Sequence, residues 1–119
     1  MNEFMNDNPE KKYIEVDEEF MIRSEQDAID IAALCAEKGA SSILFRYKNL
    51  APSFFDLKTG LAGEVLQKFM TYKIRVAAII PSDKITGKFR EMVIESNRGN
   101  HFKVFETKKE AENWLLKIE

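Results

Sequence analysis

Short apolar runs alternate with longer amphipathic stretches along the chain from residue 13 onward. A short apolar run that is bounded by polar or turn-forming residues predicts a β-strand. The predicted strands span residues 13–16, 19–22, 42–45, 74–80 and 102–105, and the first two form a hairpin through Asp17 and Glu18. Because residues 76–80 are apolar without interruption, we expect the fourth strand to be interior, with both faces covered.

Apolar residues at helical spacing predict four helices that follow these strands. The helices lie at residues 24–39, about 59–72, 81–99 and 107–118. Ser24 is a typical N-cap, and Gly39 is a typical terminating residue. Thr107 and Glu110 have the spacing of a capping box, and Pro81-Ser82-Asp83 is expected to cap the third helix.

The order of the predicted elements is strand-strand-helix followed by three strand-helix pairs. Alternating strands and helices imply an α/β fold with a mixed, mostly parallel sheet of about five strands, flanked by four helices. The 119 residues suffice for one domain, which we place at residues 12–119. Residues 1–11 are polar and lack a periodic apolar pattern, so we expect a flexible N-terminal tail.

Composition excludes several classes of protein. Eighteen basic and twenty acidic residues leave a net charge of −2, so the chain has no basic field for nucleic acid. One cysteine excludes an internal disulfide, and one histidine excludes a His-rich metal site. The chain shows neither an apolar run of membrane-spanning length nor the start of a signal peptide. These features predict a cytoplasmic protein that binds no membrane.

The segment that differs most from ordinary core packing surrounds a predicted helix start. Asp56, Lys58, Thr59, Gly60 and Gly63 lie there. In one interpretation these residues only shape the chain: Asp56 forms an Asx-turn, Thr59 caps the helix, and Gly63 makes room for the sheet. In the other, the bare first turn admits a partner or a ligand. The sequence leaves both interpretations open.

Other candidate residues lie at the two ends of the sheet. Helix N-termini near Asp56, Thr59, Ser82 and Thr107 would gather at the carboxyl ends of the strands, where free amides can bind an anion. Arg98, at the opposite end, is a secondary candidate for contact with a partner or an acidic side chain.

Catalytic chemistry finds little support in the sequence. Cys35 falls in an apolar helical stretch that favours an inert buried thiol. We identify no catalytic motif and predict no catalytic, cofactor-binding or metal-binding residue.

Three motifs carry a resemblance to a known family. FFDLKTGLAGEVLQKF at residues 54–69, ESNRG at residues 95–99 and KVFETKKEAENWL at residues 103–115 resemble an uncharacterised bacterial family, a domain of unknown function, over residues 13–117. The order of elements is also similar, more distantly, to that of STAS domains, which include anti-sigma-factor antagonists.

The STAS resemblance implies a regulatory role for the helix start. Those domains carry a D-[ST]-[ST]-G-[LIV] motif in which a hydroxyl residue is phosphorylated. Thr59, Gly60 and Leu61 match the end of that motif, Asp56 matches its aspartate with one residue inserted, and Leu57 and Lys58 depart from it.

The leading hypothesis is a non-enzymatic, STAS-like regulatory or protein-interaction domain whose surface surrounds Thr59. The alternative is a small-molecule or anion-binding domain at the amide-rich end near Asp56, Thr59, Ser82 and Thr107. Homodimerisation through an exposed apolar helix face is a third hypothesis. The expected partner is a protein.

Overall fold

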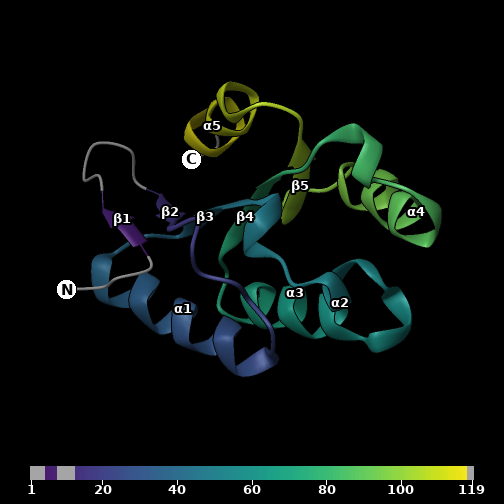
Figure 1. Ribbon diagram of the computed structural model, residues 1–119. Helices are drawn as coiled ribbons and strands as arrows, with labels where there is room; N and C mark the ends of the chain where they lie inside the picture. The colour runs from purple at the N-terminus through teal and green to yellow at the C-terminus, as the bar shows by residue number, and fades with distance from the viewer. Residues whose placement is uncertain (1–4, 8–12, 118–119) are drawn as a thin grey trace.

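The computed structural model describes residues 5–7 and 13–117 (Figure 1). The strands are β1 (Met5–Asp7), β2 (Ile14–Val16), β3 (Ser42–Arg46), β4 (Arg75–Ile79) and β5 (Phe102–Phe105). The α-helices are α1 (Glu25–Lys38), α2 (Pro52–Phe55), α3 (Leu61–Thr71), α4 (Gly87–Ser96) and α5 (Lys108–Lys117). Three 3₁₀ turns join them: η1 (Tyr47–Asn49), η2 (Leu57–Thr59) and η3 (Ser82–Lys84).

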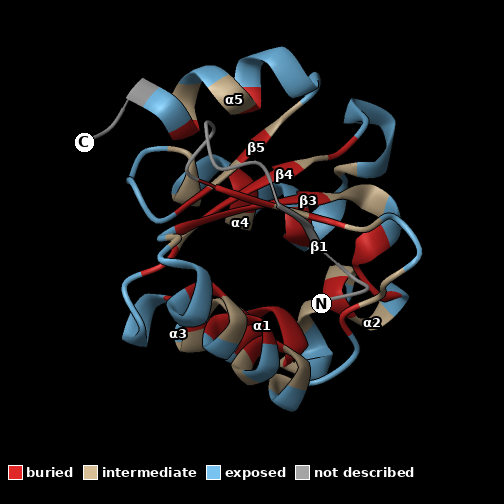
Figure 2. Cartoon of the chain, turned by 90° about the vertical axis from the view of Figure 1, so that its left-hand side faces the viewer, coloured by how far each residue is buried: buried red, intermediate tan, exposed pale blue. Residues whose placement is uncertain are grey.

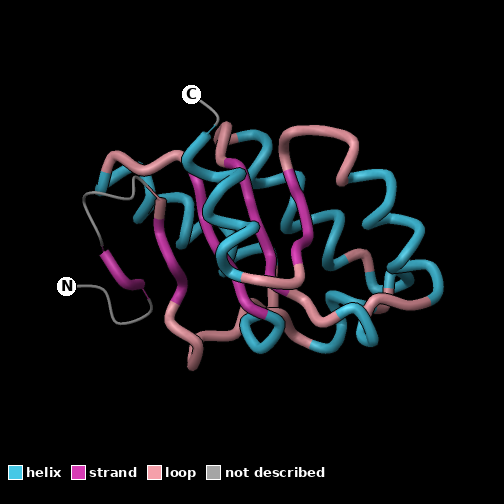
Figure 3. Tube along the Cα trace, turned by 90° about the horizontal axis from the view of Figure 1, so that it is seen from above, coloured by secondary structure: helices cyan, strands magenta, loops and turns pink. Residues whose placement is uncertain are grey.

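The strands lie side by side in chain order, as Figure 3 shows from above. β2, β3, β4 and β5 are parallel, and β1 pairs antiparallel with β2 at one edge. The parallel part therefore has four strands, and the predicted hairpin is wrong. Residues 19–22 do not pair with β2; Ile22 instead forms an isolated bridge with Leu50.

Helices cover both faces of the sheet, but unequally (Figures 1 and 2). Each parallel strand lies next to its successor on the same side, so right-handed crossovers place all the connecting helices on one face. α1, α2, α3 and α4 contribute to the main core on that face, and α5 contributes to a smaller cluster on the other. No reversal of strand order occurs in the parallel part, so it lacks the crevice that binds ligands in doubly wound sheets.

The interior strand β4 confirms the prediction for residues 74–80. Val76 and Ala78 belong to the main core, whereas Ala77 belongs to the smaller cluster beneath α5. Alternate residues of a strand point to opposite faces, and both faces are covered here. An apolar run without alternation follows directly from that arrangement.

The ends of the helices follow the predicted capping only in part. Ser24 Oγ accepts from Asp27 N at 3.3 Å, and Gly39 ends α1 with φ 73°. Thr107 Oγ1 accepts from Glu110 N at 3.2 Å.

Two helices begin later than predicted, and one was not predicted. The N-cap of α3 is Gly60, and that of α4 is Thr86, because the residues proposed as caps, at 59 and at 81–83, belong to or precede 3₁₀ turns. α2 forms within the expected loop, where Pro52 at its first position has a backbone suited to a helix start.

Most of the predicted tail lies outside the described residues. Within it, residues 5–7 form β1 against β2.

At the other edge of the sheet, the side chain of Asn97 pairs with the backbone of β5. Val104 N donates to Asn97 Oδ1 at 2.9 Å, and Asn97 Nδ2 donates to Val104 O at 3.3 Å.

Candidate functional site

The predicted site occupies two successive turns before α3. Asp56 ends α2 and begins η2, where its Oδ1 accepts from Lys58 N at 3.2 Å. This contact is an Asx-turn, as the structural interpretation of the sequence predicted. The side chains of Asp56 and Lys58 are exposed.

Thr59 joins the two turns to the start of α3. Its hydroxyl donates toward Ser53 O at 2.7 Å and Asp56 O at 2.9 Å, and it accepts from Leu61 N at 3.2 Å. The residue is nevertheless exposed. Thr59 thus does not cap α3 from the N-cap position, but it satisfies one of the free amides of the first turn.

The two glycines of the segment differ in their roles. Gly60 has φ 79°, a left-handed conformation that favours glycine. Gly63 lies exposed in the first turn of α3, and a Cβ built there meets nothing within 4 Å. The expectation that Gly63 makes room for the sheet is therefore wrong, and its surface is open.

Aromatic side chains pack against one another on the inner side of the segment that precedes α3. The rings of Phe55 and Phe89 lie 4.9 Å apart, edge to face, and those of Tyr47 and Phe55 lie 5.2 Å apart. Phe54 is fully buried beside them. Tilted and edge-to-face contacts of this kind stabilise the packing of the rings, and the turns lie against this aromatic cluster.

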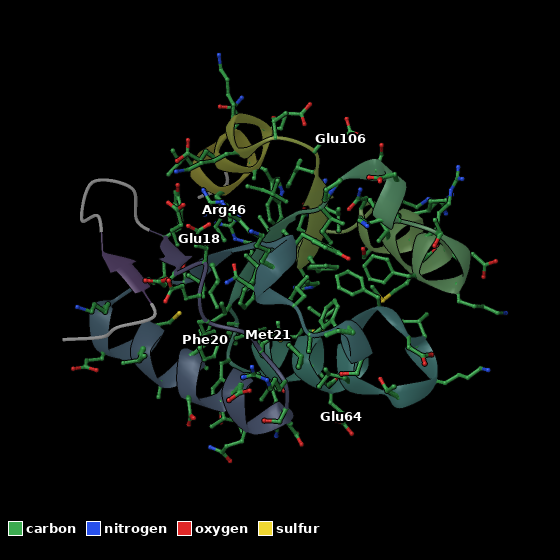
Figure 4. All side chains as sticks on the ribbon, viewed as in Figure 1. Glu18, Phe20, Met21, Arg46, Glu64 and Glu106 are labelled. Atoms are coloured by element: carbon green, nitrogen blue, oxygen red, sulfur yellow. The ribbon has the colours of Figure 1, made fainter. Side chains whose placement is uncertain are left out.

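The other predicted site residues belong to separate elements, η3 and the start of α5. Ser82 is exposed in η3 and caps no α-helix. Thr107 precedes α5, on the opposite face of the sheet from α3; Figure 4 shows the neighbouring Glu106 above the sheet and Glu64 of α3 below it. The N-termini of α3 and α5 thus lie on opposite faces of the sheet and do not share one amide-rich pocket.

Arg98 lies near the end of α4, at the other end of the sheet. Its Nη1 is 3.6 Å from Glu95 Oε1, and both side chains are largely exposed, so the contact resembles a surface ion pair of small energetic value. Asn97 is the C-cap of this helix.

A charged cluster on the α5 face was not predicted. Glu15 Oε2 of β2 lies 2.6 Å from Arg46 Nη1 of β3, and Glu15 Oε1 lies 3.1 Å from Lys108 Nζ of α5. Partial burial opposes ionisation of Glu15, but the hydrogen bonds and charges of its two partners outweigh that effect and lower its pKa. The cluster borders a polar depression of about 300 Å³ that also contains Asp17 and Glu18 (Figure 4).

Sequence comparison assigns the chain to a family. The family model of DUF4180, a domain of unknown function, matches residues 8–115. The chain belongs to the DUF4180 family. No curated protein and no solved structure matches the chain.

Asn49 is the main buried polar residue that sequence reasoning missed in this DUF4180 domain. Its Oδ1 accepts from Arg46 N at 2.7 Å, and its Nδ2 donates to Asp17 O at 2.8 Å and to Phe20 O at 2.7 Å. Only its position between a strand and a proline-containing loop hinted at this role. Asn49 fastens the connection between β2 and α1 to the end of β3.

Cys35 of the DUF4180 domain is a buried free thiol. Burial raises the pKa of the Cys35 thiol to about 12, which makes its reactive thiolate scarce. Within residues 5–7 and 13–117, no three side chains of His, Cys, Asp or Glu gather where they would hold a metal ion. In the same part of the chain, no helix has the length and apolar character needed to cross a bilayer.

Proposed function

We propose that this DUF4180 domain is a non-enzymatic, STAS-like interaction domain of the cytoplasm that binds a protein partner through the Thr59 surface. We define the Thr59 surface as Asp56, Lys58, Thr59, Gly60 and Gly63. One observation carries the proposal: Asp56, Lys58 and Thr59 are exposed on a backbone that the side chains of Asp56 and Thr59 hold in place by hydrogen bonds.

The form of the surface favours a macromolecule over a small ligand. Its residues line neither the polar depression beside Glu15 nor the apolar pocket between α3 and α4. Half-buried Phe55 and Leu57 alternate with exposed Asp56, Lys58 and Thr59. Apolar side chains surrounded by polar ones are typical of protein interfaces, and a rigid backbone lowers the entropy lost on binding.

The hydrogen bonds of Thr59 also suggest how binding is regulated. A phosphoryl group transferred to Thr59 Oγ1 from a nucleotide, by a separate kinase, replaces the hydroxyl proton. The donated bonds to Ser53 O and Asp56 O are then lost, and about −1.5 to −2 charges are added. Phosphorylation would thus change the charge of the Thr59 surface and loosen the turns that shape it.

A matched pair of charge reversals tests the proposal. Lys58→Glu changes the Thr59 surface, whereas Lys88→Glu makes the same change at an exposed position of α4. Proteins captured from the native cell by wild type and both variants are compared by quantitative mass spectrometry, and the captured partner is then titrated against each purified domain. We expect at least a tenfold weaker affinity for Lys58→Glu, with thermal stability unchanged.

Equal affinities of the partner for all three proteins would contradict the proposal. Analytical ultracentrifugation of the wild type covers the remaining case: self-association that Lys58→Glu abolishes would identify the partner as a second copy of the chain. Self-association that survives Lys58→Glu would place the dimer interface elsewhere.

A further inference from the structure

An apolar pocket of about 210 Å³ lies between the carboxyl-terminal halves of α3 and α4. Leu66, Phe69 and Met70 of α3 form one wall, and Ile74, Val76 and Phe102 form the base. Because α3 runs for eleven residues, or about 16 Å, this pocket and the Thr59 surface lie at opposite ends of the helix.

The pocket lies beside the last turn of α4, which places only small or polar side chains there. α4 contributes Phe89 and Val93 to the main core, both from its first seven residues. Its last turn presents Glu95 and Ser96 to the pocket instead, so no large apolar side chain of α4 fills the space beside Met70.

We propose that this pocket binds a small aromatic molecule that carries one N–H or O–H donor. The proposal does not depend on the Thr59 surface. Phe69, Val76 and Phe102 are almost fully buried, so the base is already formed, whereas Met70 is 44 % exposed and can adjust to a ligand. Aromatic rings pack well against phenylalanine edges and against a methionine sulfur.

Volume fixes the size of the ligand. A protein cavity of about 150 Å³ accommodates benzene, which has six non-hydrogen atoms. In the same proportion, 210 Å³ accommodates about eight to nine non-hydrogen atoms. This size matches one substituted ring or a small fused pair.

The mouth of the pocket determines which polar group the ligand carries. Glu95, Ser96, Gly99 and His101 surround it. The hydroxyl of Ser96 already donates to Val93 O at 3.2 Å, so it offers an acceptor. Glu95 Oε1 lies 3.6 Å from Arg98, which does not line the pocket, so the carboxylate still presents an acceptor and a negative charge to the mouth. A donor group at the mouth therefore fits, and a carboxylate does not.

Indole is a suitable probe because it has nine non-hydrogen atoms and one N–H donor. Titration followed by backbone and methionine-methyl NMR should shift the signals of Met70, His101 and Phe102. We expect a dissociation constant below about 1 mM, which is attainable for a ligand of this size. Phenylacetate, an aromatic carboxylate, should bind at least fivefold more weakly.

Two variants on one helix provide a matched control. Ser96→Phe fills the mouth, whereas Ile94→Phe adds the same ring at a position that does not line the pocket. Indole affinity should fall at least tenfold in Ser96→Phe and remain within twofold in Ile94→Phe. Met70→Asp is a second test in case Ser96→Phe does not fold. Met70 is exposed enough for the domain to accept a charge there, and the variant should abolish binding of indole.

Three results would overturn the proposal. The first is the absence of shifts at Met70, His101 and Phe102 up to the solubility limit of indole. The second is equal affinity for indole in the wild type and Met70→Asp. The third is tighter binding of phenylacetate than of indole, which would assign the pocket to anions.

Discussion

Replacement of Asn49 by aspartate changes one buried group and keeps its size. In the wild type, the side-chain amide of Asn49 donates to Asp17 O and Phe20 O, and its oxygen accepts from Arg46 N. Aspartate retains the acceptor but removes both donors. In the ionised form it places a carboxylate oxygen within about 2.8 Å of two carbonyl oxygens.

The loss of stability expected for Asn49→Asp follows from these contacts and from the complete burial of Asn49. Desolvation raises the pKa of the new carboxyl group in the folded variant, so this group takes up a proton at pH 7, at a cost of about 1.4 kcal/mol for each pH unit above the ordinary aspartate pKa. The protonated group regains one O–H donor, so one hydrogen bond of about 1 kcal/mol is lost in addition. We expect Asn49→Asp to lose at least about 3 kcal/mol of the free energy of unfolding at pH 7.

Urea denaturation followed by circular dichroism measures this loss. With a slope near 2 kcal/mol per molar urea, the midpoint should fall by about 1.5 M. Because the folded variant binds the proton more tightly than the unfolded chain does, the loss should shrink as the pH falls toward 4. Asn113→Asp, at an exposed position of α5, is the control and should change stability by less than about 0.5 kcal/mol.

A loss below about 1 kcal/mol at pH 7 would refute the role assigned to Asn49. Amide hydrogen exchange of the wild type gives an independent measurement that needs no variant. The amides of Arg46 and Ile22, which donate to the side chain and the backbone of Asn49, should exchange almost as slowly as the interior of β4. Rapid exchange at both positions would contradict the same reasoning.

Two further predictions concern α3 and the charged cluster. Gly63→Ala should raise the free energy of unfolding by about 0.5–1 kcal/mol, since a Cβ there meets no other atom within 4 Å. Gly60→Ala should lower the free energy of unfolding by about 1–2 kcal/mol because Gly60 has a positive φ. Thermal melts that rank the two variants in the opposite order would contradict this assignment. Glu15→Gln should lower the free energy of unfolding by about 1–3 kcal/mol at pH 7. The pKa of Glu15 is lowered in the fold, so its stabilisation is present above the ordinary glutamate pKa and is lost as the pH falls through the folded value. Urea titrations at pH 7 and pH 3 should show this difference closing, and Glu18→Gln, at an exposed position, should show no such pH dependence.

The sequence predicted the elements whose signals are local. The apolar residues 76–80 identified an interior strand, the cap at Ser24 occurs as predicted, and the hydroxyl of Thr107 makes its half of the predicted capping box. Each of these features depends on burial or on a hydrogen bond within a few residues of the chain. The strand expected at residues 19–22 failed because long-range contacts decide its course: Ile22 pairs with Leu50, and Asn49 binds the carbonyls of the preceding turn.

For the candidate site too, the sequence predicted the local features and missed those that depend on distant contacts. The Asx-turn at Asp56 is a local feature, and the sequence indicated it. The donors and acceptors of the Thr59 hydroxyl depend on α2, a helix of four residues that no periodic pattern could reveal. The apolar pocket is lined by residues from α3, α4, β4 and β5 that lie far apart in the chain, so it has no local sequence signature.

The pairing of Asn97 with β5 has a consequence for how other chains can approach the domain. An outer strand normally exposes N–H and C=O groups that another strand can add to, both in peptide recognition and in aggregation. The outward groups of Val104 are already bound by an amide side chain that imitates a neighbouring strand. Strand addition at this edge would first have to displace Asn97, which shields β5 against growth of the sheet from one molecule into the next.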